Sequence, residues 1–394
     1  MNDLEQLKSW VETVQEHMSD LSKPQAVVLA LWSFGIVVTQ SCGLTTVTVF
    51  LSLLLGCKET AMRQRLREWY WGKEDKKGKK RCELEVTLCF APLLKWVLSW
   101  WPAEEMRLAL AMDASSLSDR LTVLAISVVY RGCAIPVAWI VVKGNTKGAW
   151  KPHWLALLAH LKNSIPADWF VLVTADRGLW APWLFQAIIE NHWHPFLRIN
   201  LGAKCRPEGT HTFRWVSQLI PERGMYWSGR VTCFKSKPLD CTLLACWGEE
   251  HKEPWVILTD VAPEQADVLW YSLRPWIECG FKHIKRSGWG WHRTRMTDPK
   301  RATRFWLALA VATLWSVSVG GEVDAQIIAS TLDALPERHI ARRLATGRST
   351  SRRLSCLRLG IISILVALII DQPLPVGRFL PESWPSSPVV YDTS

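Results

Sequence analysis

The chain has 394 residues, of which 49% are hydrophobic and 21% charged, and its formal net charge is +11. This composition indicates a globular protein and excludes a small disulfide-stapled domain, and the length is enough for two or three structural units. The 25 tryptophans exceed what packing alone usually requires, so some are expected at surfaces or ligands.

The positive charge is concentrated in three segments. Residues 58–81 carry a net charge of +6, residues 281–304 of +7 and residues 337–358 of +6. For one such segment, solvated charge on a loop would be the simpler interpretation. Three of them favour a polyanionic partner, because clustered Lys and Arg neutralise phosphates and release counterions.

The eleven cysteines include no pair at C-x-x-C spacing, so we expect reduced thiols and no structural zinc site. No basic segment followed by an apolar core and a cleavage site opens the chain. The expected location is therefore the cytoplasm of a bacterial cell, in association with the nucleoid.

Three apolar runs, at residues 27–38, 44–55 and 359–370, raise the alternative of membrane association. Each has about a dozen residues, fewer than the roughly 20 that a membrane-spanning helix needs. Buried core helices are the favoured interpretation, so no membrane partner is expected.

Residues 1–105 are predicted to form a helical N-terminal DNA-binding region. The apolar run 44–55 is followed by T-A-M-R-Q-R-L-R-E-W-Y, where Thr60 would cap a second helix. This order is typical of a helix-turn-helix, although an ordinary helical hairpin fits it equally well. Three arginines of the second helix are candidates for contact with a DNA groove or backbone: Arg63, Arg65 and Arg67.

Residues 106–200 are predicted to form the first part of an α/β core. Three β-rich runs are followed by a helix at 151–162, a strand, a helix at 182–190 and a further strand. This order is that of a ribonuclease H-like fold, a mixed sheet with helices packed on it.

The rest of the chain divides into three predicted regions. Residues 201–258 contain short β-prone pieces and are expected to form a β-rich insertion subdomain. Residues 259–325 are helical in pattern, especially 264–318, and would complete the core. Residues 326–394 would form a C-terminal helical region and a proline-rich tail, with 326–370 as a possible assembly surface.

Two aspartates are expected at the ends of buried strands, Asp113 after R-L-A-L-A-M and Asp176 after V-L-V-T-A. In the ribonuclease H-like order these strands are neighbours, so the two carboxylates would converge on rigid backbone suited to holding a metal. Either residue alone is more often a turn or capping aspartate.

A third carboxylate, Glu278, lies in the stretch Y-S-L-R-P-W-I-E-C-G-F-K-H-I-K. On an ideal helix, Tyr271, Arg274, Glu278 and Lys285 would form one narrow stripe. A surface ion-pair stripe is the alternative, because Arg274 and Glu278 are four residues apart. Pro275 disfavours helical backbone at the residue before it, so the helix is expected to be kinked there or to begin there.

The full spacing Y-x2-R-x3-E-x6-K resembles the signature of DDE transposases of the insertion-sequence type, in the group named for insertion sequence four. Asp113, Asp176 and Glu278 match the catalytic acids of that family, and Tyr271, Arg274, Glu278 and Lys285 match its signature at every offset. The β-rich insertion and the intervals of 63 and 102 residues between the acids also fit. So do the phrases A-D-R-G-L-W and G-W-G-W-H-R-T-R-M-T-D-P.

The resemblance implies that the three acids bind two Mg²⁺ or Mn²⁺ ions about 4 Å apart for in-line phosphoryl transfer. It also implies that Arg274 and Lys285, with Lys282 beside them, grip DNA phosphates and that Tyr271 positions the strand. The implied reaction is cut-and-paste transposition through nicking, hairpin formation and strand transfer.

The implied partners are double-stranded DNA, as terminal inverted repeats and as target, and a second copy of the chain. No G-x-x-x-x-G-K-[ST] motif occurs, so no nucleotide cofactor is expected. The alternative function is that of a domesticated, catalytically silent relative that binds DNA as a regulator.

Overall fold

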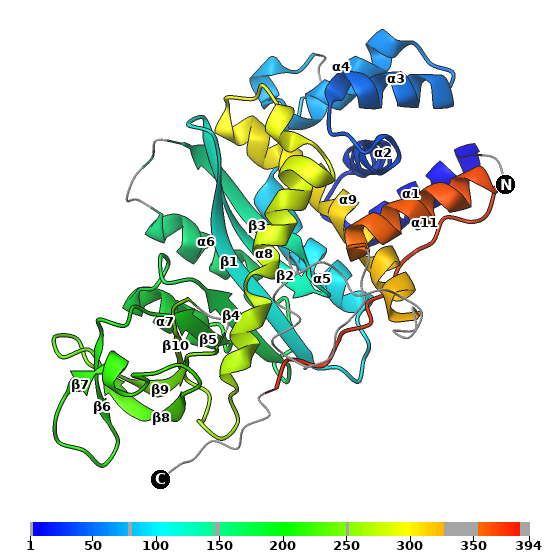
Figure 1. The fold of residues 1–394 in the computed structure, drawn as a ribbon. Helices are drawn as coiled ribbons and strands as arrows, with labels where there is room; N and C mark the ends of the chain where they lie inside the picture. The colour runs from blue at the N-terminus through cyan, green and yellow to red at the C-terminus, as the bar shows by residue number, and fades with distance from the viewer. Residues whose placement is uncertain are drawn as a thin grey trace.

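The computed structural model describes residues 3–77, 81–144, 146, 150–249, 252–326 and 354–386. In these parts of the chain a large mixed sheet is covered by helices, which makes the fold α/β (Figure 1). The N-terminal helices gather at one end of the sheet and the β-rich segment at the other.

The N-terminal region is helical, as the sequence predicts. Its helices are α1 (Asp3–His17), α2 (Lys23–Thr39), α3 (Leu44–Leu54), α4 (Glu59–Tyr70) and α5 (Phe90–Ser99). The predicted cap at Thr60 is wrong, because α4 begins at Glu59 and its N-cap residue is Lys58. The first two apolar runs form α2 and α3, which meet at a bend of 101°.

The first seven elements of the core follow the predicted order. They are β1 (Arg107–Leu117), β2 (Leu121–Tyr130), β3 (Cys133–Lys143), α6 (Lys151–Leu161), β4 (Phe170–Ala175), α7 (Pro182–Ile189) and β5 (His194–Arg198). Strands β1 to β3 are antiparallel, whereas β4 is parallel to β1 and β5 is parallel to β4. Every residue of β2 is buried, as expected for a strand covered on both faces.

The β-rich segment predicted over residues 201–258 continues this same sheet. Its strands are β6 (Lys204–Pro207), β7 (Arg214–Trp215), β8 (Tyr226–Cys233), β9 (Leu239–Cys246) and β10 (Trp255–Thr259). Strand β10 pairs with both β5 and β9 and so joins the two halves into the order β3-β2-β1-β4-β5-β10-β9-β8-β6-β7.

Helical structure returns after β10 but is not continuous over 264–318. A 3-10 segment (Val268–Leu273) is followed by α8 (Trp276–Lys282), a π-helical turn (His283–Ser287) and a short 3-10 turn (Trp291–Arg293). Regular helix resumes only with α9 (Pro299–Gln326), which runs through the core.

Among the residues described, α9 is the one helix long and apolar enough to cross a membrane, and 89% of its most apolar window is buried inside the protein. The bent pair α2 and α3 passes the same test only when the two are counted together. The burial of α9 identifies it as a core helix, the element on which β3, α2 and α11 pack.

The third apolar run forms α11 (Cys356–Ile369), which packs directly on α9. The two helices approach closely at Gly320 and Gly360: a Cβ on either glycine would lie 1.7 Å from a carbonyl oxygen of the other helix. Only glycine allows backbones so near each other. Most of the assembly surface suggested at 326–370 lies outside the described residues.

The proline-rich tail is extended, as expected, but it is anchored to the core. Phe379 is fully buried, its backbone N–H donates to the carbonyl of Trp100, and the carbonyl of Leu380 accepts from Arg131. Arg131 also pairs with Asp324 at 2.9 Å. All eleven cysteines are free thiols, in agreement with the sequence-based expectation.

Candidate active site

The register of β1 and β4 brings Asp113 and Asp176 together. The parallel pairing of the two strands ends at Met112 and Ala175. Asp113 directly follows Met112, and Asp176 directly follows Ala175. The prediction that a strand ends at Asp113 is wrong in one respect: β1 continues to Leu117, still paired with β2. Asp113 therefore sits on backbone fixed from one side by β2, at the point where β4 leaves the sheet.

The guanidinium of Arg274 joins all three predicted acids. Its Nη2 lies 3.0 Å from Oδ2 of Asp113 and 3.5 Å from Oδ2 of Asp176. Its Nη1 donates to Oε1 of Glu278, one helical turn further along the chain. The three carboxylates, which are far apart in the sequence, thus surround one cation.

The carboxylates differ in burial. The side chain of Asp113 is 18% exposed, that of Asp176 37% and that of Glu278 48%, whereas Arg274 is 10% exposed. Asp113 is therefore the most buried of the three acids and Glu278 the most exposed.

Burial raises the pKa of Asp113 to about 6, although Arg274 opposes this effect by stabilising the charged form. Burial alone would lower the pKa of Arg274, but the surrounding carboxylates outweigh it and the pKa is raised. Arg274 is therefore a permanent cation, while Asp113 changes charge in the weakly acidic range.

Asp176 is a turn aspartate that also contacts Arg274. Its Oδ1 accepts from the backbone N–H groups of Gly178, at 2.9 Å, and Leu179, at 3.2 Å, which is the behaviour of a turn aspartate. Its Oδ2 faces Arg274. The turn fixes the carboxylate while leaving one oxygen directed into the site.

The signature stretch does not form one ideal helix. Arg274 follows the 3-10 segment, and α8 begins directly after Pro275, as expected if a helix starts at this proline. Tyr271 is 3% exposed and packs edge-to-face on Trp255, with ring centroids 5.3 Å apart. Its ring is thus buried, whereas the sequence suggested contact with a DNA strand.

The two lysines of the stretch lie on its C-terminal side. Nζ of Lys285 donates to the carbonyl oxygen of Ser116 at 3.0 Å, three residues beyond Asp113 on β1. Burial lowers the pKa of Lys285, and the neighbouring charge of Arg286 lowers it further. Lys282 is exposed on α8.

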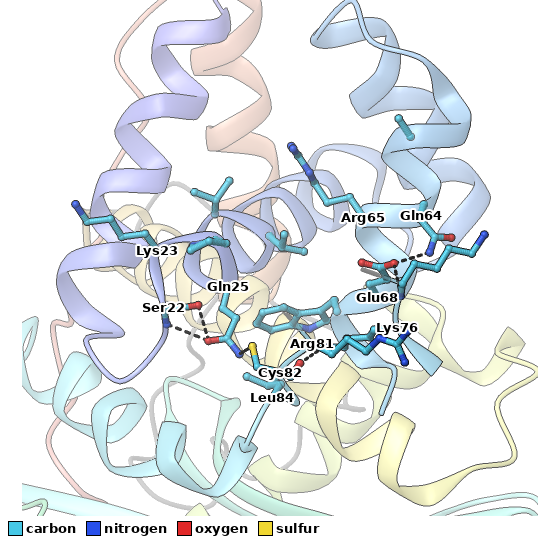
Figure 2. A pocket seen from close by; sticks show the side chains of 16 residues that line it. Ser22, Lys23, Gln25, Gln64, Arg65, Glu68, Lys76, Arg81, Cys82 and Leu84 are labelled. Carbon is cyan, nitrogen blue, oxygen red and sulfur yellow. Dashed lines mark hydrogen bonds between the residues drawn. The ribbon is translucent and has the colours of Figure 1, made fainter. Parts of the chain in front are cut away.

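The three arginines of α4 do not share one surface. Arg63 and Arg67 line one cleft, where Arg63 donates to Oγ1 of Thr45 and the guanidinium of Arg67 lies 4.5 Å from the ring centroid of Trp71. Arg65 lines a different pocket on the opposite side of α4, with Lys23 and Lys76 around it (Figure 2).

The residues best placed to hold a metal ion are Asp113, Asp176 and Glu278. Carboxylate oxygens are the ligands that Mg²⁺ and Mn²⁺ prefer. Among the residues described, however, no three metal-ligating side chains are close enough to share one ion. The guanidinium of Arg274 contacts all three carboxylates, so their oxygens could bind a metal ion only if that side chain moved aside.

Sequence reasoning assigned Arg274 to DNA and missed its place among the acids. The signal was present, since Arg274 and Glu278 are an i,i+4 pair. Its contacts with Asp113 and Asp176 depend on the register of β1 and β4 and on the turn at Pro275, which spacing alone does not give.

Comparison with known proteins gives one family match. Residues 127–315, just under half of the chain, match the family model described as "Transposase DDE domain". No curated protein matches the chain. The matched range contains Asp176 and Glu278 and begins after Asp113.

Among the solved structures similar to this chain is the "Cryo-EM structure of piggyBac transposase synaptic complex with hairpin DNA (SNHP)". It is 10% identical, the TM-score is 0.40, and the alignment covers 94% of this chain and 80% of the other. At this TM-score the likeness does not establish a common fold. The family match supports the assignment of a transposase DDE domain to residues 127–315.

Proposed function

We propose that the protein is a divalent-metal-dependent DNA transposase of the cut-and-paste type, with Asp113, Asp176 and Glu278 as its catalytic acids. The observation that carries the proposal is the convergence of these carboxylates on the guanidinium of Arg274. A cluster of acids at an open sheet edge is suited to holding cations, and the family match supplies the reaction class.

A ribonuclease H-like core is part of the proposal. Its support is the partial strand order β3-β2-β1-β4-β5, with three antiparallel strands followed by two parallel ones. The strand β10 and the segment after it then return the chain to the site, so that Glu278 on α8 faces the two aspartates.

The chemistry that a bound pair of Mg²⁺ or Mn²⁺ ions supplies is activation of the attacking oxygen and stabilisation of the leaving oxygen at phosphorus. The chain's own residues would hold and orient the reactants. Asp113 and Asp176, fixed by the sheet and by a turn, would provide rigid ligands, and the more exposed Glu278 would be the third. Arg274, once released from the carboxylates, can pair with a DNA phosphate in the bidentate manner of a guanidinium.

The finer assignment, to the group named for insertion sequence four with hairpin formation, rests on the spacing of Tyr271, Arg274, Glu278 and Lys285. Lys285, anchored beside β1 by Ser116, is placed to contact a phosphate near the acids. The proposed partners are terminal inverted repeats, target DNA and a second copy of the chain, since joining two element ends requires two sites.

The test is cleavage of a labelled DNA duplex that carries the inverted repeats flanking this gene, with Mg²⁺ and with Mn²⁺. Glu278→Gln is the matched control, because Glu278 is 48% exposed and its replacement should leave the fold intact. We expect metal-dependent nicks and hairpins at the repeat boundary with the wild-type protein and neither with the control.

Two outcomes would overturn the proposal. Binding of the repeats without cleavage by both proteins would favour the catalytically silent regulator, and cleavage by the control would show that Glu278 is not the third acid. Nicks without hairpins would keep the enzyme class and remove the hairpin step.

A further inference from the structure

A cleft of about 1040 Å³ lies between the N-terminal helices and the segment that links α8 to α9. In Figure 1 this segment, in yellow, extends from α8 towards the blue helices α3 and α4. One wall contains residues of α4 and of the α2–α3 turn, and the other contains residues 286–298. The charged side chains that line the cleft are Arg63, Arg67, Arg286, Arg293, Arg295, Asp298 and Arg301.

The charge of this arginine cleft is largely uncompensated. Its one carboxylate, Asp298, is 3.7 Å from Arg301, which also pairs with Asp75 at 3.0 Å. Among the residues described, none of the other five arginines has a carboxylate within ion-pair distance. Arg286, Arg293 and Arg295 are exposed. The cleft therefore presents several guanidinium groups that have no anionic partner among the described residues.

The walls of the cleft are held together by direct contacts. The backbone N–H of Cys42 donates to the carbonyl of Trp289 at 2.8 Å, and Nη1 of Arg304 donates to the carbonyl of Tyr70 at 3.1 Å. Arg120, in the turn between β1 and β2, donates to the carbonyl of Thr294 at 2.9 Å. The cleft is thus preformed, so a ligand would not have to supply the free energy needed to order it.

The π-helical turn links the cleft to the carboxylate site. Arg286 follows Lys285, whose Nζ is anchored on β1 close to Asp113. The pKa of Lys285 responds to both neighbours, since Arg286 lowers it and Asp113 raises it. A chain of basic groups therefore runs from the acids along the π-helical turn into the cleft.

The geometry points to the arginine cleft as the binding site for the sugar–phosphate backbone of one DNA strand, adjacent to the strand end held at the carboxylates. This inference rests on the proposed function and adds to it a substrate-positioning surface. Arginine is suited to this task because its planar fork of donors pairs with phosphate in a bidentate manner. The stacking of Arg67 on Trp71 holds this guanidinium in place at the wall of the cleft.

The site combines elements from both regions of the chain. Arg63 and Arg67 come from α4, and Arg286, Arg293 and Arg295 come from the segment after α8. A DNA strand bound here would contact the N-terminal region and the catalytic segment at once, which would fix its register relative to the acids. Arg65, on the other side of α4, would not take part.

The test measures DNA binding by the full-length Glu278→Gln protein in EDTA, so that no cleavage contributes. Fluorescence anisotropy with a labelled duplex carrying the terminal repeat is recorded over a series of salt concentrations. The cleft variant is Arg286→Ala, Arg293→Ala and Arg295→Ala together. The charge-matched control is Lys8→Ala, Lys95→Ala and Lys162→Ala together, three exposed lysines outside the cleft.

We expect the cleft variant to bind on the order of tenfold more weakly or worse, and the control to change little. The slope of log K against log salt should fall by roughly 2 to 3 in the cleft variant, because each lost phosphate contact removes about 0.9. Replacing the same three arginines by lysine should retain most of the slope, since the charge remains.

If the parent protein binds tightly, and the cleft variant has the same affinity and salt slope as the control with Lys8→Ala, Lys95→Ala and Lys162→Ala, the inference is overturned. The proposed function would still stand. Absence of binding by the parent protein to any duplex would instead contradict the proposed function itself. Circular dichroism of each variant identifies a loss of affinity that comes from unfolding.

Discussion

The carboxylate site and the arginine cleft are neighbouring charged regions. The first has an excess of acidic side chains and the second an excess of basic ones. At the carboxylate site three acids share the single guanidinium of Arg274. The cleft is lined by six arginines and one carboxylate, Asp298, which pairs with Arg301 alone. At the carboxylate site most charges have an opposite charge beside them, whereas most arginines of the cleft have none among the described residues.

Burial explains why the balance differs. Arg274 and Asp113 are 10% and 18% exposed, and an unpaired charge at such depth is strongly unfavourable. The arginines of the cleft are mostly at the surface, where water solvates them at little cost. The comparison therefore predicts that removing a charge costs stability at the carboxylate site and costs binding in the cleft.

The largest effect on stability is expected for Arg274→Ala. The change leaves Asp113 buried beside two further carboxylates with no cation among them, and breaking a buried ion pair costs about 3–5 kcal/mol. Because Asp176 and Glu278 are partly exposed, we expect a value of about 3 kcal/mol, or a melting temperature lower by roughly 5 °C.

The matched experiment uses Arg274→Lys and a titration with Mn²⁺, followed by differential scanning calorimetry. Lysine keeps the charge and should lose less stability. If the carboxylates bind metal, Mn²⁺ should raise the melting temperature of Arg274→Ala more than that of the wild-type protein, where the guanidinium must first be displaced. If Mn²⁺ raises the melting temperatures of the two proteins equally, Arg274 does not occupy the place that the metal ion would take.

An effect of similar size is expected from the pH dependence of Asp113. Its pKa is raised to about 6 in the folded protein from 3.8, so between these values the folded state binds more protons than the unfolded state. Stability then falls as the pH rises through this window and is level above it. The change in pKa corresponds to about 3 kcal/mol.

Comparison of the wild-type protein with Asp113→Asn in metal-free buffer isolates this contribution. The wild-type protein should lose stability relative to the variant between pH 4 and pH 7, as measured by urea unfolding at each pH. A difference between the two proteins that does not change with pH would show that the pKa of Asp113 is not raised.

The secondary structure that carries the carboxylate site could be predicted from the sequence, because it depends on local patterns of apolar residues. Strands β1 to β5 and helices α6 and α7 follow from runs of β-branched and apolar residues and from their turns, because the strands are buried along most of their length and each helix buries one apolar side. The start of α8 directly after Pro275 was also predictable, but the expected loss of helical backbone at Arg274 was wrong, because Arg274 has φ −58° and ψ −44°.

The contacts of Arg274 and the burial of Tyr271 were not predictable in the same way. Both depend on how the 3-10 segment before Pro275 lies against β10 and the edge of β4, which is a property of tertiary packing. The divergence of Arg65 from Arg63 and Arg67, by contrast, could have been predicted from the spacing, because on a helix residues four apart share a face and residues two apart do not. The sequence identified the segment 281–304 as basic. That this segment and α4 line the same cleft could be seen only from the tertiary structure.

The smallest effect on stability is expected for the double change Arg293→Ala and Arg295→Ala. These exposed side chains have no carboxylate partner among the residues described, so stability should stay within about 0.5 kcal/mol of the parent. At low salt the variant should even be slightly more stable, because repulsion among the remaining arginines is reduced, and the difference should vanish at high salt. Urea unfolding at two salt concentrations measures both effects. A large loss of stability at either concentration would mean that these arginines have structural partners, and the contrast between the two charged regions would then be lost.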